Sequence, residues 1–540
     1  MAQALLSQKR TIVLYNPNPK RNEKKYDVAL ALLSVSSMLD KEGFDIKIMN
    51  HSDEDVVNKL LEQCREAICF GLTVMTGNQI GDAAMVSKLI KENYPELPII
   101  YGGWHASILP YETIDNDYVD IVVKGQGESS LTEIVHALIE NKPLHEIKGI
   151  LFKENGKIIT TAERQTEDLN NFPPLPYHLV PAEKLVTPVT EIASRTITYF
   201  TSMGCPHRCT FCADPLVYKR RWKALKAERV VDDMQRMVND YDINGIVFTD
   251  TNFFTDEKRV AAICRGIIER GLKFRWGSVN GRTEHLLRYK DETWELLKQA
   301  NFHSFLIGAE SALEDVLLDL KKDATVQQTV EFTKKCAKYG FKIYFSFFIG
   351  MPDERYKDNP EIKLNKEINA LMNLIDTILG IEREHMYYLL IYTPYPGSPL
   401  FDTSKNLGFN PPKSFEEWAD FEHDTTNSPW IPKKYVDLMD QLNMLYIPFL
   451  TNNIFKKADN YSSLGRLFIK PLCHLAYLPI KLRWKHRFFK FPIEYHALRL
   501  AKSILRKLQL SSFYKWDDIN KEHMTHRDQL KDLQSLGVGA

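Results

Sequence analysis

The sequence predicts an α/β protein in three parts: a doubly wound parallel sheet, an incomplete barrel of six βα units, and a helical C-terminal region. Short apolar runs alternate with helical stretches over residues 11–141 and again from residue 196, and the alternation stops after about residue 400. Because a helix follows each strand, the strands of each series are expected to be parallel. A chain of 540 residues is also too long for one hydrophobic core.

The composition indicates a folded protein without a membrane span. The chain is 44% hydrophobic and 26% charged with zero formal net charge, which argues against disorder, a channel, or a generally nucleic-acid-binding surface. It has no long apolar run, and its start lacks a signal-peptide pattern. Five cysteines stand singly, as buried thiols do in a reducing compartment: Cys64, Cys69, Cys264, Cys336 and Cys473. We expect a cytoplasmic protein and no nucleic-acid partner.

The first predicted domain, residues 1–145, contains five strand–helix units. Ligands of such sheets bind beyond the carboxyl ends of the strands. Three strand ends here are rich in glycine, which lets a ligand approach the backbone closely. They read "GLTVMTG" (71–77), "GGWHAS" (102–107) and "GQGESS" (125–130).

A hairpin and a proline-rich linker are predicted over residues 146–190. Asn155 and Gly156 lie between two alternating runs, which is a strong hairpin signal. The stretch "NNFPPLPYHLVP" that follows is typical of an extended linker.

The second domain, residues 191–400, is expected to form the incomplete barrel. Polar residues follow its strands at the face that is catalytic in βα barrels, among them Asp250, Asn252, Ser278 and Glu310. The stretch "GCPHRCTFC" (204–212) comes directly after the first strand and holds Cys205, Cys209 and Cys212. The three cysteines are therefore expected on the catalytic face.

Three clustered thiols favour an iron–sulfur site over a structural zinc site. Structural zinc takes four protein ligands, and the sequence offers no second cysteine pair to supply the fourth thiolate. His207 lies within the motif, but the loop is too short for it to complete a tetrahedron comfortably. A [4Fe-4S] cluster with three cysteine ligands leaves one iron open for a ligand. Zinc stays the alternative.

The motif "CPHRCTFC", after a strand that opens a six-unit βα series, resembles the radical S-adenosylmethionine enzymes. The resemblance implies that Cys205, Cys209 and Cys212 hold a [4Fe-4S] cluster, whose open iron binds S-adenosylmethionine and cleaves it to a 5′-deoxyadenosyl radical. It also assigns S-adenosylmethionine contacts to strand-end residues. These are Phe211, Asp250, Asn252, Ser278, Glu310, Gly350 and Pro352. "DTNFF" (250–254) departs from the common Gly-Gly-Glu of that family, which weakens the contact expected there.

The N-terminal domain in front of this barrel resembles the flavodoxin-like domain of the cobalamin-binding radical enzymes. The resemblance covers roughly residues 10–400 and implies cobalamin as a further cofactor. The expected contacts lie at the strand ends: Thr73, Gly102, Gly103, His105, Gly125, Gly127 and Glu128. The D-x-H-x-x-G signature that supplies histidine to cobalt is missing, and Gln126 and Met203 also depart from the group's pattern. Cobalamin is therefore expected to bind without a protein histidine on cobalt.

The region 401–540 is predicted to be helical and locally basic. Residues 481–507 carry nine Lys and Arg against one acid, Glu494, with aromatic residues between the charges. Such a stretch can contact an anionic membrane surface, although a helical cap on the barrel is the simpler explanation. RNA binding is a weaker third alternative, because no nucleic-acid fold signature accompanies the stretch. Membrane contact would suggest a hydrophobic small-molecule substrate and a peripheral place at the inner membrane surface.

Three hypotheses for function follow from these features. The first is cobalamin-dependent methylation of an unactivated carbon, with an electron donor such as a flavodoxin or ferredoxin. The second is a radical cyclase, oxidase or carbon–carbon coupling enzyme of the same architecture. The third is a structural or sensing metal-cluster protein that is not an enzyme.

Overall fold

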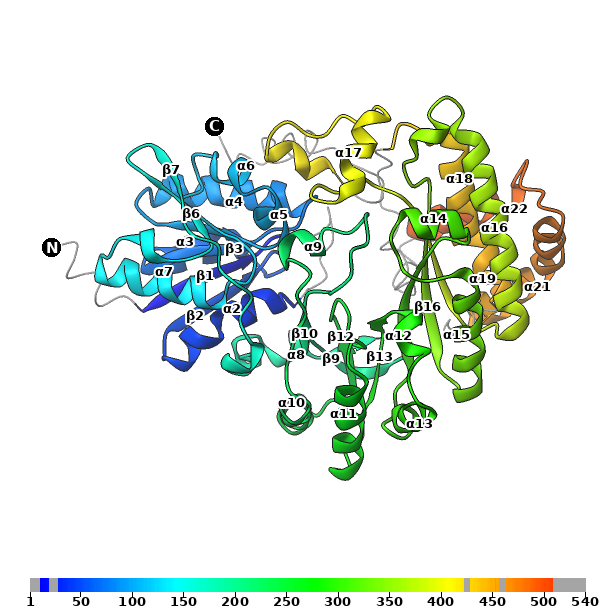
Figure 1. The fold of residues 1–540 in the computed structure, drawn as a ribbon, viewed down its shortest axis with the longest axis horizontal. Coiled ribbons are helices and arrows are strands. Elements are labelled where there is room, and N and C mark those ends of the chain that lie inside the picture. Colours follow the sequence, from blue (N-terminus) through cyan, green and yellow to red (C-terminus); the bar gives the residue numbers. More distant parts are fainter. Residues whose placement is uncertain are drawn as a thin grey trace.

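The computed structural model describes residues 10–18, 28–189, 191–421, 428–451, 453–455 and 463–507. Figure 1 shows the three predicted parts in a row: the N-terminal sheet at the left, the barrel in the middle and C-terminal helices at the right. The fold class predicted from the sequence is confirmed. Residues 508–540, the end of the predicted helical region, lie outside the described residues.

The N-terminal sheet has seven strands in the order β2-β1-β3-β4-β5-β6-β7. The first five are parallel, and their 2-1-3-4-5 order is the flavodoxin-like one, whose ligand site lies where the order reverses between β1 and β3. The strands are β1 (Thr11–Asn16), β2 (Asp45–Asn50), β3 (Ala67–Thr73), β4 (Ile99–Gly102), β5 (Ile121–Val123), β6 (Ile150–Glu154) and β7 (Lys157–Thr160).

Helices cover both faces of this sheet, as the doubly wound fold requires. Helices α2 and α7 pack together, as do α3 and α4. Short helices α5 and α6 follow β4. The helices are α2 (Leu30–Lys41), α3 (Val56–Cys64), α4 (Gln79–Asn93), α5 (Trp104–Ile108), α6 (Pro110–Ile114) and α7 (Glu128–Glu140).

The hairpin and the proline-rich stretch both belong to packed structure. Strand β6 pairs antiparallel with β5, so the hairpin extends the N-terminal sheet beyond the expected boundary at residue 145. Within the proline-rich stretch, Phe172 and Tyr177 are buried, and the Tyr177 hydroxyl donates to the Thr198 carbonyl. This stretch is therefore a layer between the domains and not an extended spacer. It holds two 3-10 turns, Leu169–Asn171 and Tyr177–Leu179, followed by α8 (Ala182–Leu185).

Six parallel βα units form the incomplete barrel. Its strands make two four-stranded sheets, β13-β12-β9-β8 and β14-β15-β16-β17. Strands β13 and β14 are one strand interrupted at Ser278, where φ is +57°. A parallel bridge from Trp276 to Phe302 continues the barrel across the break. The strands are β8 (Thr187–Val189), β9 (Ala193–Tyr199), β12 (Gly245–Phe248), β13 (Arg275–Gly277), β14 (Val279–Gly281), β15 (Ser304–Glu310), β16 (Lys342–Ile349) and β17 (Met386–Ile391).

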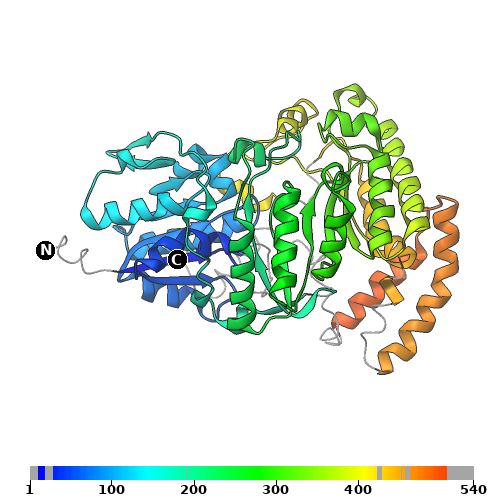
Figure 2. The ribbon, with the colours of Figure 1, turned by 60° about the horizontal axis from the view of Figure 1, so that its bottom comes forward.

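The barrel helices stand side by side along its outside, in green in Figure 2. Aromatic side chains such as Trp276, Trp294 and Phe305 are fully buried in this domain. The helices are α9 (Asp214–Val217), α10 (Ala227–Tyr241), α11 (Glu257–Glu269), α12 (Thr283–Leu286), α13 (Asp291–Gln299), α14 (Glu314–Asp319), α15 (Val326–Tyr339) and α16 (Pro360–Ile381).

The C-terminal region is helical and packs on the other two parts. Trp484 of α21 is buried, and its indole N–H donates to Asp376 of α16 at 2.6 Å, so part of the basic stretch caps the barrel. Helices α21 and α22 (orange) project at the far end of the molecule in Figure 2. The elements are α17 (Pro399–Asn406), a 3-10 turn (Glu416–Asp420), α18 (Lys433–Gln441), a π-helical turn (Leu442–Tyr446), α19 (Ile447–Leu450), α21 (Ser463–Lys485) and α22 (Ile493–Lys507). No described helix is long and apolar enough to cross a membrane.

The segment 415–421 reaches back from the C-terminal region to the N-terminal domain. The ring of Phe415 lies 5.7 Å from that of Tyr101, between centroids, and Glu416 pairs with Lys88 at 2.6 Å. Further along, the indole N–H of Trp430 donates to the Gly350 carbonyl of the barrel at 2.8 Å. The described C-terminal residues therefore contact both domains.

Candidate functional site

The three clustered cysteines lie on one loop that leaves the first barrel strand. Strands β10 (Ser202–Met203) and β11 (Lys223–Ala224) pair antiparallel and close residues 204–222 into the cysteine loop. Gly204 opens this loop at φ +74°, and a Cβ there would lie 2.1 Å from the Arg221 carbonyl oxygen. Only glycine fits this position, which explains the residue in front of the motif.

The thiols of the cysteine loop are shielded from water. Cys209 is buried, and Cys205 and Cys212 are half-buried. Burial raises the pKa of Cys205 and raises that of Cys212 to about 12. Thiols in such surroundings ionise when a bound metal offsets the negative charge. The loop therefore suits a metal centre better than a reactive free thiolate.

The spacing of the thiols fits a cluster better than one ion. In the described structure, the three cysteine sulfurs do not lie close enough together to be ligands of one metal ion. The sulfurs also have donors nearby: the Arg282 guanidinium donates to Cys209 Sγ at 3.3 Å, and Asn252 Nδ2 lies 3.9 Å from Cys205 Sγ. Hydrogen bonds to sulfur set the potential of iron–sulfur clusters. The residues present fit a [4Fe-4S] cluster.

The strand-end residues Asp250 and Asn252 differ in whether their side-chain oxygens already have hydrogen-bond partners. The Asp250 carboxylate is buried and accepts hydrogen bonds from the Thr201 amide at 3.0 Å, the Thr201 hydroxyl at 2.7 Å and the Ser202 hydroxyl at 2.5 Å. It thus fixes the chain just before the cysteine loop. Asn252 is also buried, but its Oδ1 has no hydrogen-bond partner in the described structure. Asn252 is the better placed of the two to accept from a ligand.

Glu310 and Lys322 form a buried ion pair beside the cysteine loop. Lys322 Nζ lies 2.8 Å from Glu310 Oε1, and both side chains are less than a tenth exposed. The Lys322 ammonium also lies 5.9 Å from the ring centroid of Phe211, which in turn lies 6.1 Å from that of Phe348. Removing one partner of such a pair costs about 3–5 kcal/mol. The pair therefore holds Glu310 firmly while its other oxygen, Oε2, has no partner in the described structure.

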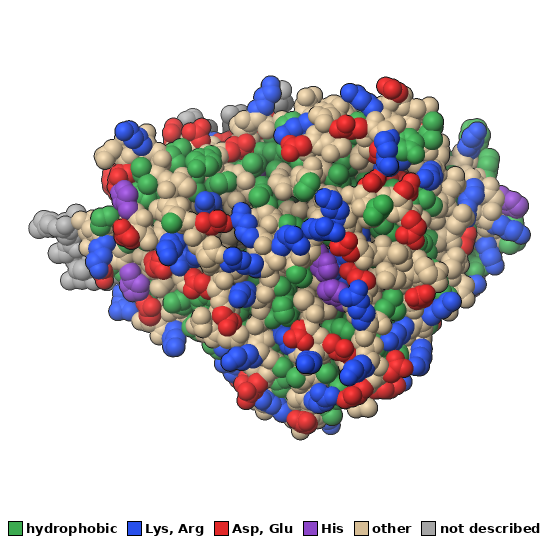
Figure 3. All heavy atoms as spheres, viewed as in Figure 1, with side chains coloured by type: hydrophobic (Ala, Val, Ile, Leu, Met, Phe, Trp, Pro, Cys, Tyr) green, Lys and Arg blue, Asp and Glu red, His purple; other side chains and the backbone are tan. Residues whose placement is uncertain are grey.

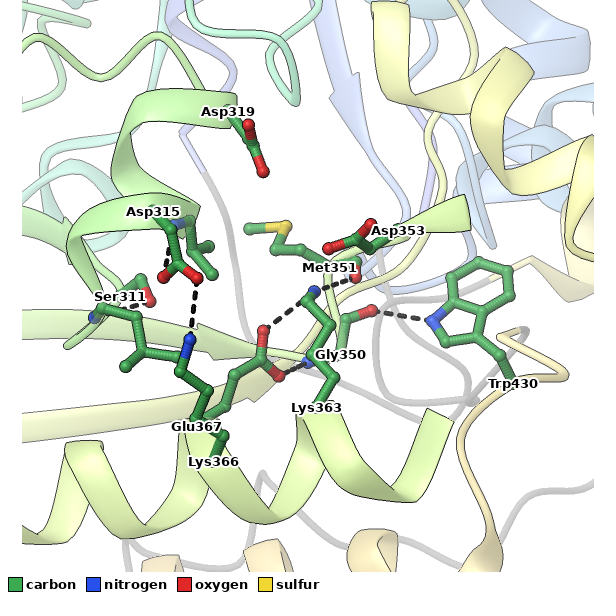
Figure 4. Close-up of polar contacts among 12 residues, drawn as sticks. Ser311, Asp315, Asp319, Gly350, Met351, Asp353, Lys363, Lys366, Glu367 and Trp430 are labelled. Atoms are coloured by element: carbon green, nitrogen blue, oxygen red, sulfur yellow. Dashed lines mark hydrogen bonds and ion pairs between the residues drawn. The ribbon is translucent and has the colours of Figure 1, made fainter. Parts of the chain in front are cut away.

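The turn after β16 is held in place by a helix and by the C-terminal region (Figure 4). Gly350 has φ +75°, and its amide donates to Glu367 of α16 at 2.8 Å. Lys363 pairs with the same carboxylate at 3.0 Å and donates to the Met351 carbonyl. Trp430 binds the Gly350 carbonyl from the other side. The backbone of residues 350–352 is thus presented as a fixed surface, as the expected contact at Gly350 and Pro352 requires.

Ser278 lies at the break in the third barrel strand. Its amide donates to the Ser304 hydroxyl at 3.0 Å, which stabilises the left-handed backbone. The break redirects the chain that carries Arg282 and α12 toward the cysteine loop. The third strand continues beyond Ser278 as β14, and Ser304 is the first residue of β15 whereas Glu310 is its last, so the structure does not bring Ser278 to the strand-end face of the other predicted contacts.

A pocket of about 880 Å³, its open mouth included, lies at the carboxyl end of the N-terminal sheet. Six of the seven residues predicted to bind cobalamin line it: Thr73, Gly102, Gly103, Gly125, Gly127 and Glu128. Its remaining wall includes Met203, Val217 and Tyr218, which flank the three cysteines in the chain. The two predicted cofactor sites are therefore neighbours.

Polar groups in this pocket can meet a ligand that carries amides. Gln126 lines the pocket, and its buried Nε2 has no hydrogen-bond partner among the described residues, while its Oε1 accepts from the Glu167 amide at 2.7 Å. Glu128 is buried and accepts from the Ser34 hydroxyl at 2.5 Å. Burial raises the pKa of Glu128. The apolar walls and the free amide donor fit part of a cobalamin.

His105 is the residue of the predicted set that the structure does not bring to the pocket. Its ring is buried between Phe415 and Trp418, with centroids 5.3 and 5.8 Å away, and its Nδ1 lies 3.0 Å from the Thr76 hydroxyl. Burial lowers the pKa of His105 to about 3, so the imidazole is neutral. In the structure it joins the N-terminal domain to the segment 415–421.

Sequence reasoning missed three charged residues in or beside the cysteine loop. Arg282 and Lys322 are described above. The third, Asp214, is buried two residues after Cys212, and neither carboxylate oxygen has a hydrogen-bond partner among the described residues. Burial raises its pKa to about 7. Arg282 could have been found from "SVNGR", whereas Lys322 comes from a turn after α14 that carries no motif.

Comparison with known proteins agrees with this geometry. The family model of the Radical SAM superfamily matches residues 199–363, and that of the B12 binding domain matches residues 26–135. A flavodoxin-like domain whose ligand pocket abuts a cysteine loop on a βα barrel defines a class of radical enzymes. This chain is a radical S-adenosylmethionine enzyme with an N-terminal cobalamin-binding domain. Its cofactors are a [4Fe-4S] cluster, S-adenosylmethionine and cobalamin.

Individual relatives extend the similarity over most of the chain. An uncharacterized methyltransferase of Pyrococcus horikoshii is 29% identical over 380 residues, which are 69% of this chain and 77% of that protein. The hopanoid C-3 methylase of Methylococcus capsulatus is 22% identical over 77% of this chain and 76% of its own length. The solved structure of OxsB, a cobalamin-dependent S-adenosylmethionine radical enzyme with aqua-cobalamin and S-adenosylmethionine bound, matches with a TM-score of 0.63 at 16% identity, over 98% of this chain and 79% of that one.

Proposed function

We propose that this enzyme methylates an unactivated carbon of a small, hydrophobic substrate. The observation that carries the proposal is the shared wall of Met203, Val217 and Tyr218, which puts the cobalamin pocket directly against the cysteine loop. When bound, the cluster supplies the electron that cleaves S-adenosylmethionine to a 5′-deoxyadenosyl radical, and cobalamin supplies the methyl group. The names of the two relatives described above support methylation as the outcome.

In this proposal the strand-end residues hold S-adenosylmethionine over the cysteine loop. Cys205, Cys209 and Cys212 ligate the cluster. The free Oδ1 of Asn252 accepts from the methionyl amino group, and the free Oε2 of Glu310 accepts from the ribose hydroxyls. Further contacts are the ring of Phe211 and the fixed backbone at Gly350 and Pro352. Asp250 acts by positioning the loop, because its carboxylate already accepts three hydrogen bonds.

The pocket residues would bind cobalamin without a protein histidine on cobalt. The four predicted pocket glycines, Gly102, Gly103, Gly125 and Gly127, leave room for the cofactor to lie against the backbone at the end of β4 and of the turn after β5. Histidine is absent from the pocket lining among the described residues, and His105 is enclosed elsewhere. The lining that would hold the cofactor combines glycine and apolar side chains with the polar groups of Gln126 and Glu128. A cytoplasmic flavodoxin or ferredoxin as the electron donor belongs to the same proposal.

Product analysis tests the proposed reaction. With S-adenosylmethionine that carries a deuterated methyl group, a reductant, and lipid or polar metabolite fractions of the producing cells, we expect a labelled product. S-adenosylhomocysteine and 5′-deoxyadenosine should form in about equal amounts, because one molecule of S-adenosylmethionine gives the methyl group and another gives the radical.

The control is the same enzyme prepared without cobalamin, which should form 5′-deoxyadenosine but no labelled product. A cyclase, oxidase or coupling enzyme would form 5′-deoxyadenosine alone even with cobalamin present. A structural or sensing protein would form neither compound. Each of these two results contradicts methylation and identifies the hypothesis that replaces it.

We also propose that α21 and α22 contact an anionic membrane surface. Large apolar side chains are exposed there among basic ones, as Figure 3 shows at the right end of the molecule. The apolar residues are Leu475, Leu478, Leu482, Phe488, Phe491, Ile493 and Leu500, and the exposed basic ones include Lys481, Lys485, Lys490 and Arg499. Apolar side chains can enter the lipid interface while the neighbouring cations bind anionic headgroups. Membrane contact therefore accounts for both the apolar and the basic side chains that are exposed here. A hydrophobic substrate would be collected at the same surface.

Vesicle binding tests the membrane contact. The enzyme should sediment with vesicles that contain phosphatidylserine, and less so with phosphatidylcholine alone or at high salt. Replacing Leu475, Leu478 and Phe491 by serine should lower the bound fraction about tenfold or more. The matched control is Leu318→Ser, since Leu318 is 78% exposed but lies on α14. Equal loss in both variants, or no binding to either vesicle, contradicts the proposal.

A further inference from the structure

Three ligand-type side chains converge at the edge of the cysteine loop, outside the cysteine trio. His207 comes from the loop itself, and Glu284 and His285 come from α12. One ligand atom from each of them lies within 4.8 Å of the other two. Within the described residues, these three side chains are the group of metal-ligand type whose atoms lie close enough to share an ion. The two imidazole rings are 4.8 Å apart between centroids.

Each of the three side chains has an unused buried atom. His207 Nε2, Glu284 Oε2 and His285 Nδ1 are shielded from solvent and have no hydrogen-bond partner among the described residues. Glu284 is only 4% exposed. Three unpaired polar atoms at one place are costly unless a bound group satisfies them. Their number and chemistry match a cation with nitrogen and oxygen ligands.

Contacts behind the three side chains hold them in place. The second oxygen of Glu284, Oε1, accepts from Arg282. The backbone carbonyl of Phe254 lies near the ring of His285. Metal-binding histidines commonly donate their other ring N–H to a neighbouring carbonyl, which fixes the tautomer. Arg282 thus supports Glu284 from behind, and a carbonyl is available near His285.

We propose that His207, Glu284 and His285 bind one divalent metal ion of the zinc class, separate from the iron–sulfur cluster. Two imidazoles and one carboxylate are a common zinc set, with water at the fourth position. Ligand atoms that lie about 2.0–2.1 Å from a tetrahedral zinc ion are about 3.3 Å from one another. The distances between the three ligand atoms must therefore shorten by up to about 1.5 Å when the ion binds, and small side-chain rotations can supply this change. The ion ties the cysteine loop to α12.

Cations outnumber carboxylates around the three side chains. Arg282 is paired with Glu284, and Lys322 is paired with Glu310. Arg220 and Arg288 act on His207 and His285 from further away. The sulfur ligands of the neighbouring centre add negative charge when they are ionised. The Glu284 carboxylate and the ionised sulfurs are therefore the groups that would offset the charge of a bound cation.

Metal analysis of the whole enzyme tests the site. The enzyme, with its cluster assembled, is equilibrated with zinc, desalted, and analysed for iron and zinc. We expect about one zinc per chain beyond the iron of the cluster. Zinc X-ray absorption should show nitrogen and oxygen at about 2.0–2.1 Å and no sulfur, because the cysteines are not its ligands. This measurement needs no substitution, so a variant that misfolds does not decide the outcome.

Substitutions on α12 then assign the ligands without touching the cysteine motif. His285→Ala and Glu284→Gln should each weaken zinc binding by about a hundredfold or more, since even residues behind the ligands cost ten- to a hundredfold. The iron content should remain. The control is His178→Ala, an exposed histidine that pairs with Asp40. Absence of retained zinc, a sulfur shell at about 2.3 Å, or unchanged binding in both variants would overturn the proposal.

Discussion

Replacing any one of Cys205, Cys209 and Cys212 by alanine is expected to remove the iron–sulfur cluster and to stop cleavage of S-adenosylmethionine. The three thiols lie on one short loop, and each is a separate corner ligand for the cluster. Iron and sulfide should fall from about four per chain to near zero, and formation of 5′-deoxyadenosine should fall by about a thousandfold or more. Iron and sulfide quantitation and the absorbance spectrum of the anaerobic protein measure the first effect, and nucleoside analysis measures the second.

The matched control for these variants is Cys264→Ala. Cys264 is fully buried in α11 and lies outside the cysteine loop, so its loss leaves a small cavity and costs stability only. Its iron content should equal that of the unaltered enzyme. Full iron in the Cys212→Ala variant would contradict the assignment and would point to Asp214, the buried carboxyl two residues further on, as a ligand in its place.

Replacing Gly102 by leucine is expected to abolish cobalamin binding and leave the cluster intact. Gly102 ends β4 and lines the pocket, and a Cβ there would meet nothing closer than the Leu72 carbonyl at 3.9 Å. The backbone can therefore carry a side chain without strain, and the leucine occupies space that the cofactor needs. Cobalt retained after reconstitution should fall at least about tenfold, which corresponds to about 1.4 kcal/mol, while iron should not change.

Gly380→Leu is the control for added bulk alone. Gly380 lies in α16, outside the pocket lining, and a Cβ added there would meet no heavy atom within 4 Å beyond its own helix backbone. The Gly103→Leu variant is a poor test by comparison, because Gly103 has φ +92° and a Cβ would lie 2.5 Å from Thr73 Oγ1. Unchanged cobalt in Gly102→Leu would place cobalamin outside this pocket.

The fold and the cluster loop could be predicted from the sequence because their signals are local. Alternating strands and helices predict both parallel sheets, and a cysteine trio at fixed spacing after a strand indicates its own chemistry. Gly350 is also marked by a local signal, because a single turn with positive φ favours glycine whatever the rest of the chain does. The glycine-rich strand ends likewise indicated where the pocket would lie.

Features that depend on distant parts of the chain could not be predicted. Asp250 resembles a ligand contact in the sequence, yet Thr201 and Ser202, almost fifty residues earlier, occupy its carboxylate. The partner of Glu310 is Lys322, which no motif marks. His105 stands two residues after the pocket glycine Gly103 in the sequence, but Phe415 and Trp418 enclose it. In each case long-range packing decides which polar atoms stay free for a ligand.

The segment 415–421 and Trp430 have a consequence for how such enzymes can diverge. One end covers His105 and Tyr101 of the N-terminal domain, and the other binds the Gly350 turn of the barrel. A gene fusion that swapped the N-terminal domain alone would lose the matching aromatic surface, and a truncation near residue 400 would uncover both domains at once. An exchange of either cofactor-binding half is therefore expected to give a stable protein only if this segment is exchanged or redesigned with it.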